Sequence, residues 1–149
     1  MQKECHICPI SEYPIFETNH WKVFLSWDQN YLGRCLISSK RHVESLSQLT
    51  DEEMIDFHRV TEKLETGLKK AFPFTLFNWG CLMNHAFQEK PYNPHVHWHM
   101  KPRHDAPITF DGKTWIDTAF GKHYLPKTSD ILPKEKLDKI LAHIKLFIE

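Results

Sequence analysis

Pro94-His95-Val96-His97-Trp98-His99-Met100 is the most informative stretch of this sequence, and Lys101-Pro102-Arg103 follows it. Three histidines alternate with three apolar residues, which is the period of a β-strand. A strand directs alternate side chains to opposite faces, so the imidazoles project from one face and the apolar side chains from the other. The stretch therefore predicts a half-buried strand with a row of histidines.

The spacing of the histidines limits what they can do together. A strand rises roughly 3.3 Å per residue, so His95 and His99 stand about 13 Å apart. Metal ligands lie about 2 Å from the ion, so the three cannot bind one metal, although His95 and His97 can share one. The alternative is a structural strand whose polar face happens to be histidine, but histidine has no special preference for strands. We therefore expect the histidines to divide their tasks.

Composition excludes several classes of protein. The chain has 149 residues, which fits one domain, and its net charge is zero when histidine is neutral. That balance argues against a general nucleic-acid binder, which needs a basic stripe. The N-terminus lacks the apolar core of a signal peptide, and no run approaches the ~20 apolar residues of a membrane span. We expect a cytoplasmic protein without a membrane partner.

The chain is rich in histidine, with eleven, and it has four cysteines. Cysteines are reduced in the cytoplasm, so Cys5 and Cys8, at Cys-x-x-Cys spacing, are more typical of a metal site or a redox pair than of a structural disulfide. Cys35 and Cys81 lie in apolar segments, and we expect them to be core residues.

Hydrophobic periodicity predicts two amphipathic helices. Thr50 and Glu53 have the spacing of a capping box, which opens a helix. An apolar stripe at helical spacing begins at Met54, and Pro73 ends the helix. A second helix is predicted at 133–148, with an inner stripe of Leu137, Ile140, Leu141, Ile144 and Phe147.

Strand-like segments joined by short links complete the pattern. They are 21–26, 34–38, 74–83 and the histidine stretch. Asp111-Gly112 is typical of a tight hairpin turn within an otherwise irregular segment. Neighbouring strands with short links favour an antiparallel sheet with helices on one face. With no repeat and no linker, the sequence predicts a single α+β domain over 1–149.

Four motifs in this order resemble those of the histidine-triad (HIT) family of nucleotide hydrolases and transferases, in particular its diadenosine polyphosphate hydrolases. They are Cys5-x-x-Cys8, the segment Gly33-Arg34-Cys35-Leu36-Ile37-Ser38-Ser39-Lys40-Arg41-His42-Val43, Asn84, and the alternating histidines at 95–99. The resemblance covers about 5–103 and leaves 104–149 as an extension. It implies a five-stranded antiparallel sheet with a long helix, to which the extension adds a C-terminal helix, and a homodimer.

His97 and His99 are the candidate catalytic residues. A neutral imidazole is a good nucleophile at neutral pH, because its ordinary pKa is near 6.5. The resemblance implies that His97 attacks the α-phosphorus, and we expect His99 to help where negative charge gathers on the leaving phosphate. Histidine at position 99 favours the hydrolase branch, since the family's uridylyltransferases and dinucleotide phosphorylases tend to carry glutamine there.

Cys5, Cys8, His42 and His95 are the candidate ligands of a structural zinc ion. Two thiolates and two imidazoles are a common tetrahedral set. The two histidines follow from the resemblance to zinc-bearing members of the family. The alternative is an unligated or redox-active pair of cysteines, because zinc-free members exist.

Candidate contacts to the nucleoside part of a substrate depart in part from the family pattern. Asn84 matches the family's amide residue and is expected to hold the ribose or a phosphate; the alternative is an ordinary turn asparagine. Ser26 stands where the family usually carries Asp or Asn for the ribose, and Asp28 is near enough to replace it.

Candidate phosphate contacts also depart from that pattern. The family's Gly-Gln-Ser/Thr approach to the triad is replaced by 90–94, so Tyr92 or Asn93 is expected to donate in place of the missing hydroxyl, and Lys90 to add charge. Arg103 either meets distal phosphates or forms a solvated strand end.

The sequence therefore predicts a hydrolase that cleaves dinucleoside polyphosphates or adenylyl conjugates at the α-phosphate through a covalent nucleotidyl-histidine intermediate. Two alternatives stay open: a nucleotidyl transferase or phosphorylase with another acceptor, and a nucleotide-binding module with vestigial activity. The expected partners are a nucleotide substrate and a second copy of the chain, with no nucleic acid as main partner.

Overall fold

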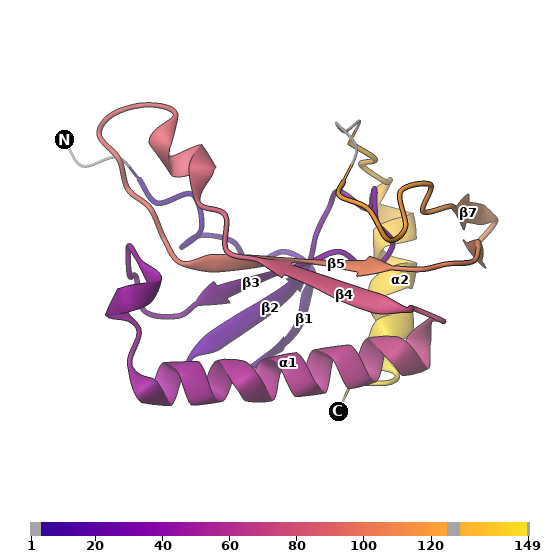
Figure 1. Cartoon of the computed structure of the whole chain (residues 1–149), viewed down its shortest axis with the longest axis horizontal. Helices are drawn as coiled ribbons and strands as arrows, with labels where there is room; N and C mark the ends of the chain where they lie inside the picture. Colours follow the sequence, from indigo (N-terminus) through magenta and orange to yellow (C-terminus); the bar gives the residue numbers. More distant parts are fainter. Residues whose placement is uncertain (1–3, 125–128, 149) are drawn as a thin grey trace.

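A five-stranded antiparallel sheet organises the fold in the computed structural model, which describes residues 4–124 and 129–148. The strand order is β1-β2-β3-β5-β4, so the histidine strand, β5, lies between two neighbours. The predicted α+β class is confirmed (Figure 1). The strands are β1 (Pro14–Glu17), β2 (Trp21–Leu25), β3 (Cys35–Ser39), β4 (Leu76–Gly80) and β5 (His97–Arg103).

Strands β1 and β5 differ from the sequence-based expectation. The sequence does not predict β1, because only Ile15 of its four residues is fully buried and the strand shows no clear alternation. Strand β5 begins at His97, two residues later than expected. Val96, just before the strand, nevertheless makes two backbone hydrogen bonds. Its N–H donates to the Val43 carbonyl (2.9 Å), and its carbonyl accepts from Ser39 N–H (3.2 Å).

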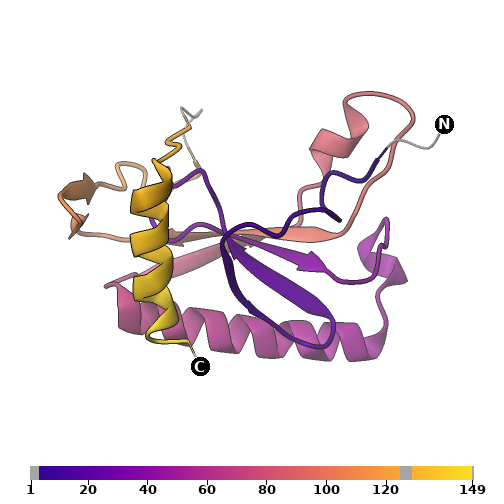
Figure 2. The ribbon, with the colours of Figure 1, turned by 180° about the vertical axis from the view of Figure 1, so that it is seen from behind.

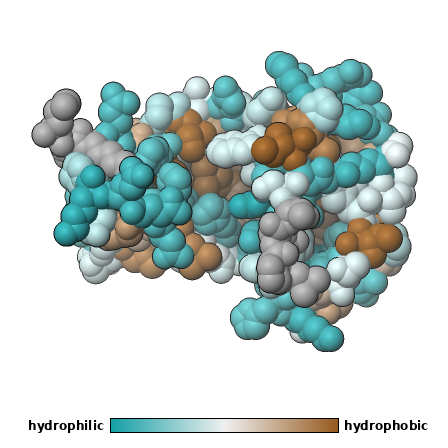
Figure 3. Space-filling model, turned by 90° about the horizontal axis from the view of Figure 1, so that it is seen from above, coloured by the Kyte–Doolittle hydropathy of each residue, from teal (hydrophilic) through white to brown (hydrophobic). Residues whose placement is uncertain are grey.

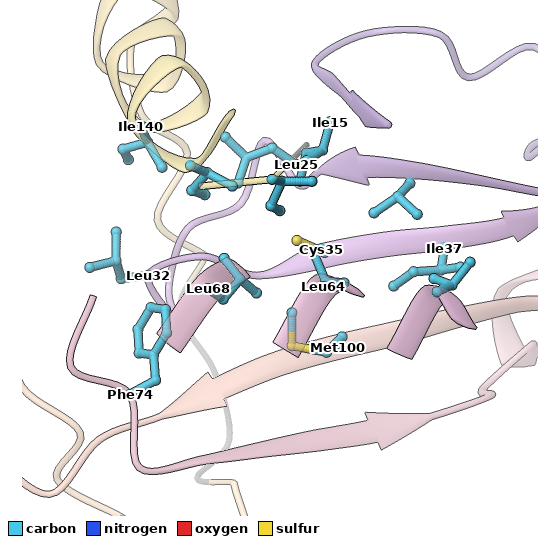
Figure 4. Packing of buried hydrophobic residues seen from close by; sticks show 14 of the residues in the cluster. Ile15, Leu25, Leu32, Cys35, Ile37, Leu64, Leu68, Phe74, Met100 and Ile140 are labelled. Carbon is cyan, nitrogen blue, oxygen red and sulfur yellow. The ribbon is translucent and has the colours of Figure 1, made fainter. Parts of the chain in front are cut away.

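Helix α1 (Asp51–Ala71) runs along one face of the sheet and covers the core (Figure 1). Val96 and Met100 are completely buried, and Phe57 of α1 stacks on Trp98 with ring centroids 4.7 Å apart. Figure 4 shows Leu64 of the helix and Met100 of the sheet within the same packed cluster. The apolar half of the alternation therefore faces the core and leaves the histidines on the opposite face.

The predicted capping box opens α1. Thr50 Oγ1 accepts from Glu53 N–H, and the Glu53 carboxylate accepts from Thr50 N–H at 2.8 Å. The guanidinium of Arg41 donates to both carboxylate oxygens and holds the pKa of buried Glu53 at about 2. Met54 is 44% exposed, so its predicted place in the apolar stripe is wrong. The buried face of the helix instead begins at Glu53, whose two partners keep its carboxylate inside.

The extension begins with a hairpin, as the sequence predicts. Strands β6 (Ile108–Phe110) and β7 (Lys113–Trp115) pair in antiparallel fashion. Both residues of the turn have positive φ angles, 48° at Asp111 and 77° at Gly112. Those angles are what a two-residue turn matching the strand twist requires.

The second predicted helix is α2 (Lys134–Lys145), which packs against α1 and β1 (Figure 2). It buries Leu137, Ile140 and Ile144. Phe147 is 37% exposed, so its predicted place on the inner stripe is wrong, because the helix ends before it and the periodicity does not continue. None of the described helices has the length and hydrophobicity to cross a membrane.

Candidate active site and metal centre

Strand β5 places His97 and His99 on the face of the sheet that α1 leaves uncovered. Their ring centroids are 5.0 Å apart, and Ser38 and Leu36 of β3 lie opposite them. Two raised segments flank this face in Figures 1 and 2: the N-terminal residues with the loop between β4 and β5, and the C-terminal extension. Figure 3 looks onto it and shows hydrophilic side chains gathered over the end with the N-terminal residues, while the other end mixes hydrophilic and hydrophobic side chains.

His97 is oriented by the backbone of its own strand. Its Nδ1 lies 2.7 Å from the His95 carbonyl oxygen, so Nδ1–H donates there and Nε2 keeps its lone pair. The ring is buried, and burial lowers its pKa below the ordinary value of 6.5. His97 is therefore a neutral imidazole at pH 7 with one defined basic nitrogen.

His99 stands one pleat further along the same face. Burial is the main reason that its pKa falls to about 4. A proton on the neighbouring His97 ring and the charges of Arg34 and Lys101 also disfavour the protonated form of His99. A backbone hydrogen bond with Leu82 acts in the opposite direction. The ring is neutral in the protein alone, and a bound anion would favour its protonated form.

The four predicted metal ligands lie together next to the triad. Their ligand atoms all lie within 4.8 Å of one another. Nδ1 of His95 is 3.4 Å from Cys5 Sγ, 3.3 Å from Cys8 Sγ and 3.1 Å from Nδ1 of His42. Cys8 Sγ is in turn 3.4 Å from His42 Nδ1. Sequence positions 5, 8, 42 and 95 thus form one site that can hold a metal ion.

The distances between the ligand atoms can be compared with those around a tetrahedral zinc ion. Ligand atoms about 2.0–2.3 Å from zinc stand about 3.3–3.8 Å from one another at tetrahedral angles. The four distances given above, 3.1–3.4 Å, are close to that range. His95 Nε2 lies 2.8 Å from the Ser39 carbonyl oxygen, so Nε2–H donates outward and Nδ1 turns its lone pair toward the thiols. The sequence does not single out Ser39, because its partner His95 is 56 residues away.

Ser26 and Asp28, the predicted ribose contacts, differ in their surroundings. Ser26 lines a pocket of about 240 Å³ whose apolar walls include Phe24, Trp27 and Leu36. Asp28 is engaged by the chain itself, since its carboxylate pairs with Arg34 at 3.2 Å and accepts backbone N–H groups of Asn30 and Asp130. The geometry favours Ser26 over Asp28 for contact with a ligand.

Asn84, Tyr92 and Asn93 all belong to the raised loop between β4 and β5. Asn84 is the exposed first residue of the 3₁₀ helix η2 (Asn84–Phe87), which lies beside the N-terminal residues. The His6 and His85 rings meet at 4.9 Å and join the two segments. Tyr92 packs on Phe87, and Lys90 Nζ lies 5.8 Å from its ring, while Asn93 is half-buried before the triad.

Arg103 is buried and bound to its own chain. Its guanidinium pairs with both oxygens of Asp117 and also donates to the carbonyls of Ala119 and Lys122 and to Asn78 Oδ1. With these donors used, the geometry does not support contact between Arg103 and a distal phosphate. These contacts instead connect the extension to strand β5 of the sheet.

Comparison with protein families finds a match over residues 10–106 to the model described as the HIT domain. Among curated proteins, an uncharacterized HIT-like protein of Methanocaldococcus jannaschii is 28% identical over 107 residues, which is 68% of this chain and 81% of that protein.

Three of the solved structures that share this fold are the following. A hypothetical histidine triad nucleotide-binding protein of Sulfolobus tokodaii has a TM-score of 0.65 at 17% identity, covering 93% of this chain and 85% of that one. A diadenosine triphosphate hydrolase of Plasmodium falciparum has a TM-score of 0.63 at 18% identity, covering 93% and 78%. A zinc-bound histidine triad family protein of Mycobacterium smegmatis has a TM-score of 0.58 at 18% identity, covering 89% and 84%.

Proposed function

We propose, on the premise that this chain belongs to the HIT domain family, that it is a hydrolase that cleaves nucleotidyl compounds at the α-phosphate. The reaction passes through a covalent nucleotidyl-histidine intermediate on His97. The observation that carries this proposal is the 2.7 Å bond from His97 Nδ1 to the His95 carbonyl, because it leaves Nε2 available to attack. The buried, neutral ring is the form that a nucleophile requires.

The two steps balance with water as the second reactant. First, the Nε2 lone pair of His97 bonds to the α-phosphorus, and the bond to the leaving-group oxygen breaks. That oxygen takes the electron pair, and His99, which takes up a proton from solvent when the anionic substrate binds, gives it that proton. Water then attacks the phosphorus, its proton passes to His99, and the phosphorus–nitrogen bond breaks. His97 recovers its lone pair as the nucleoside monophosphate leaves.

The nucleoside is proposed to lie in the pocket walled by Phe24, Trp27 and Leu36. Leu36 pairs with His99 across the sheet, so this pocket adjoins the triad face. Apolar and aromatic walls suit the face of a base, and the Ser26 hydroxyl at the same pocket suits the ribose.

A product assay tests the proposed function. Diadenosine tetraphosphate in ¹⁸O-labelled water should give AMP that carries the label and ATP that does not, because water is the acceptor. Adding millimolar phosphate should not change the products. ADP as the main product would favour a phosphorylase instead, and tight nucleotide binding without any turnover would favour a binding module.

We propose that the ion held by Cys5, Cys8, His42 and His95 is zinc with a structural role. Two thiolates and two imidazoles suit zinc among the common metals. The bond from His95 to Ser39 supports this choice, since metal-bound histidines usually donate their other N–H to such an acceptor. Four protein ligands leave no open position, so zinc would fix the N-terminal segment to the start of the triad and would not touch the phosphate.

Cys8→Ser is expected to remove the metal and to lower the melting temperature, because metal binding is coupled to folding. Elemental analysis should find one zinc per wild-type chain and almost none in the variant. Cys81→Ser is the control, since Cys81 lies outside the cluster and should keep the zinc. Folded wild-type protein that contains no zinc, with Cys5 and Cys8 both reactive toward a thiol reagent, would refute the assignment.

The homodimer, the cytoplasmic location and a single domain over 1–149 stay predictions. They rest on the sequence and on the family resemblance.

A further inference from the structure

The face of β5 that carries His97 and His99 continues beyond them to Lys101. Lys101 stands two residues after His99 and therefore projects from the same face, about 6.6 Å further along the strand. Strand β3 pairs Cys35 with Met100 and Leu36 with His99, so the next position in that register brings Arg34 opposite Lys101. The row of groups above the sheet thus runs from two imidazoles to two permanent cations.

Aromatic rings hold the Lys101 ammonium at this position. Its Nζ lies 3.9 Å from the ring centroid of Tyr124 and 5.7 Å from that of Tyr31. The two rings meet at 5.5 Å, and the Arg103 guanidinium lies 5.3–5.4 Å from both. These contacts stabilise a cation above the sheet and link its position to the extension, which supplies Tyr124.

Like charges opposite each other on neighbouring strands destabilise a sheet. Arg34 Nη1 reaches Asp28 and Asn30 at 3.2 Å, while its buried Nε has no hydrogen-bond partner among the described residues and could still donate to a ligand. The charges of Arg34 and Lys101 also reach His99, where both lower the pKa. An anion above this part of β5 would relieve the repulsion and interact with all three groups.

We propose that Lys101 and Arg34 form a subsite for the phosphates that follow the scissile bond, so that preferred substrates have a polyanionic leaving group. The inference rests on the proposed function, which places the α-phosphorus at His97. From there, one end of β5 meets the Cys/His cluster, and the other end offers the two cations. A nucleoside polyphosphate leaving group would use this subsite, whereas a neutral amine would gain nothing from it.

The test measures equilibrium binding in a His97→Ala background, where turnover does not interfere. Calorimetry without magnesium should show tighter binding from AMP to ADP to ATP, with ATP about 10- to 100-fold tighter than AMP, as expected for added charge-assisted contacts. Adding Lys101→Met should remove most of this gain. Lys70→Met is the control for the lost charge, because Lys70 is exposed on α1, and it should keep the gain.

The outcomes separate this inference from the proposed function. Equal affinities for AMP and ATP would overturn the subsite, while labelled AMP in the product assay would still support the hydrolase. If Lys90→Met and not Lys101→Met removes the gain, the phosphates follow the loop before the triad, and the subsite is again overturned. A purely structural role for Lys101 would lower the melting temperature but leave the ratio of AMP to ATP affinities unchanged, which also overturns it.

Discussion

His97→Ala is expected to lower the turnover of a dinucleoside polyphosphate by roughly 10⁴- to 10⁶-fold, while the protein stays folded and still binds nucleotide. The expected loss is large because the variant has no group that can form the bond to phosphorus, so the two-step route is closed. The ring packs above the sheet, on the face away from α1, so its removal should disturb the apolar core little. His58→Ala, at an exposed position on α1, is the control and should keep wild-type turnover.

The covalent intermediate offers a second measurement of the same prediction. Wild-type protein mixed with substrate and quenched rapidly should carry one adenylyl group per active site, stable in base and labile in acid, as phosphoramidates are. Mass spectrometry of the peptide that holds residues 90–103 should place the group on His97. An adduct on His99, or full activity of His97→Ala, would show that the roles in the triad are wrongly assigned.

Local signals in the sequence are sufficient for much of this fold. The alternation around His97 predicts which side chains face the core, and the structure confirms it through buried Val96 and Met100. Thr50 and the turn at Asp111-Gly112 mark a helix start and a hairpin through backbone geometry that involves only neighbouring residues. Such features are readable because every interacting group lies within a few positions.

Features that depend on distant partners are not readable in the same way. Whether Arg103 meets a phosphate or its own chain depends on Asp117 and on the path of the extension. The Asp28 carboxylate likewise pairs with Arg34 and accepts a hydrogen bond from Asp130 N–H, and neither partner is evident from its position in the sequence. The four ligand positions follow from the family resemblance, but the tautomer of His95 requires knowing where Ser39 lies.

His99→Gln is expected to slow turnover by about 10²- to 10⁴-fold, the usual range for loss of a proton donor. Glutamine can still donate a hydrogen bond but cannot transfer a proton. His99 is neutral in the protein alone, with a pKa of about 4, and the negative charge of a bound polyphosphate would raise that pKa toward the protonated form. The substitution should therefore remove proton transfer while keeping a donor of similar reach.

The leaving group decides whether His99 acts as that donor. An amine leaving group, as in the phosphoramidate of AMP with a simple alkylamine, cannot leave without a proton, whereas the p-nitrophenyl ester of AMP releases p-nitrophenolate, a stabilised anion that needs little help. His99→Gln should therefore lose much less activity with the p-nitrophenyl ester than with the phosphoramidate, and His58→Gln should lose little with either. An equal loss with both substrates would mean that His99 positions the phosphate without giving up a proton, and the proton in the first step would have to come from another group.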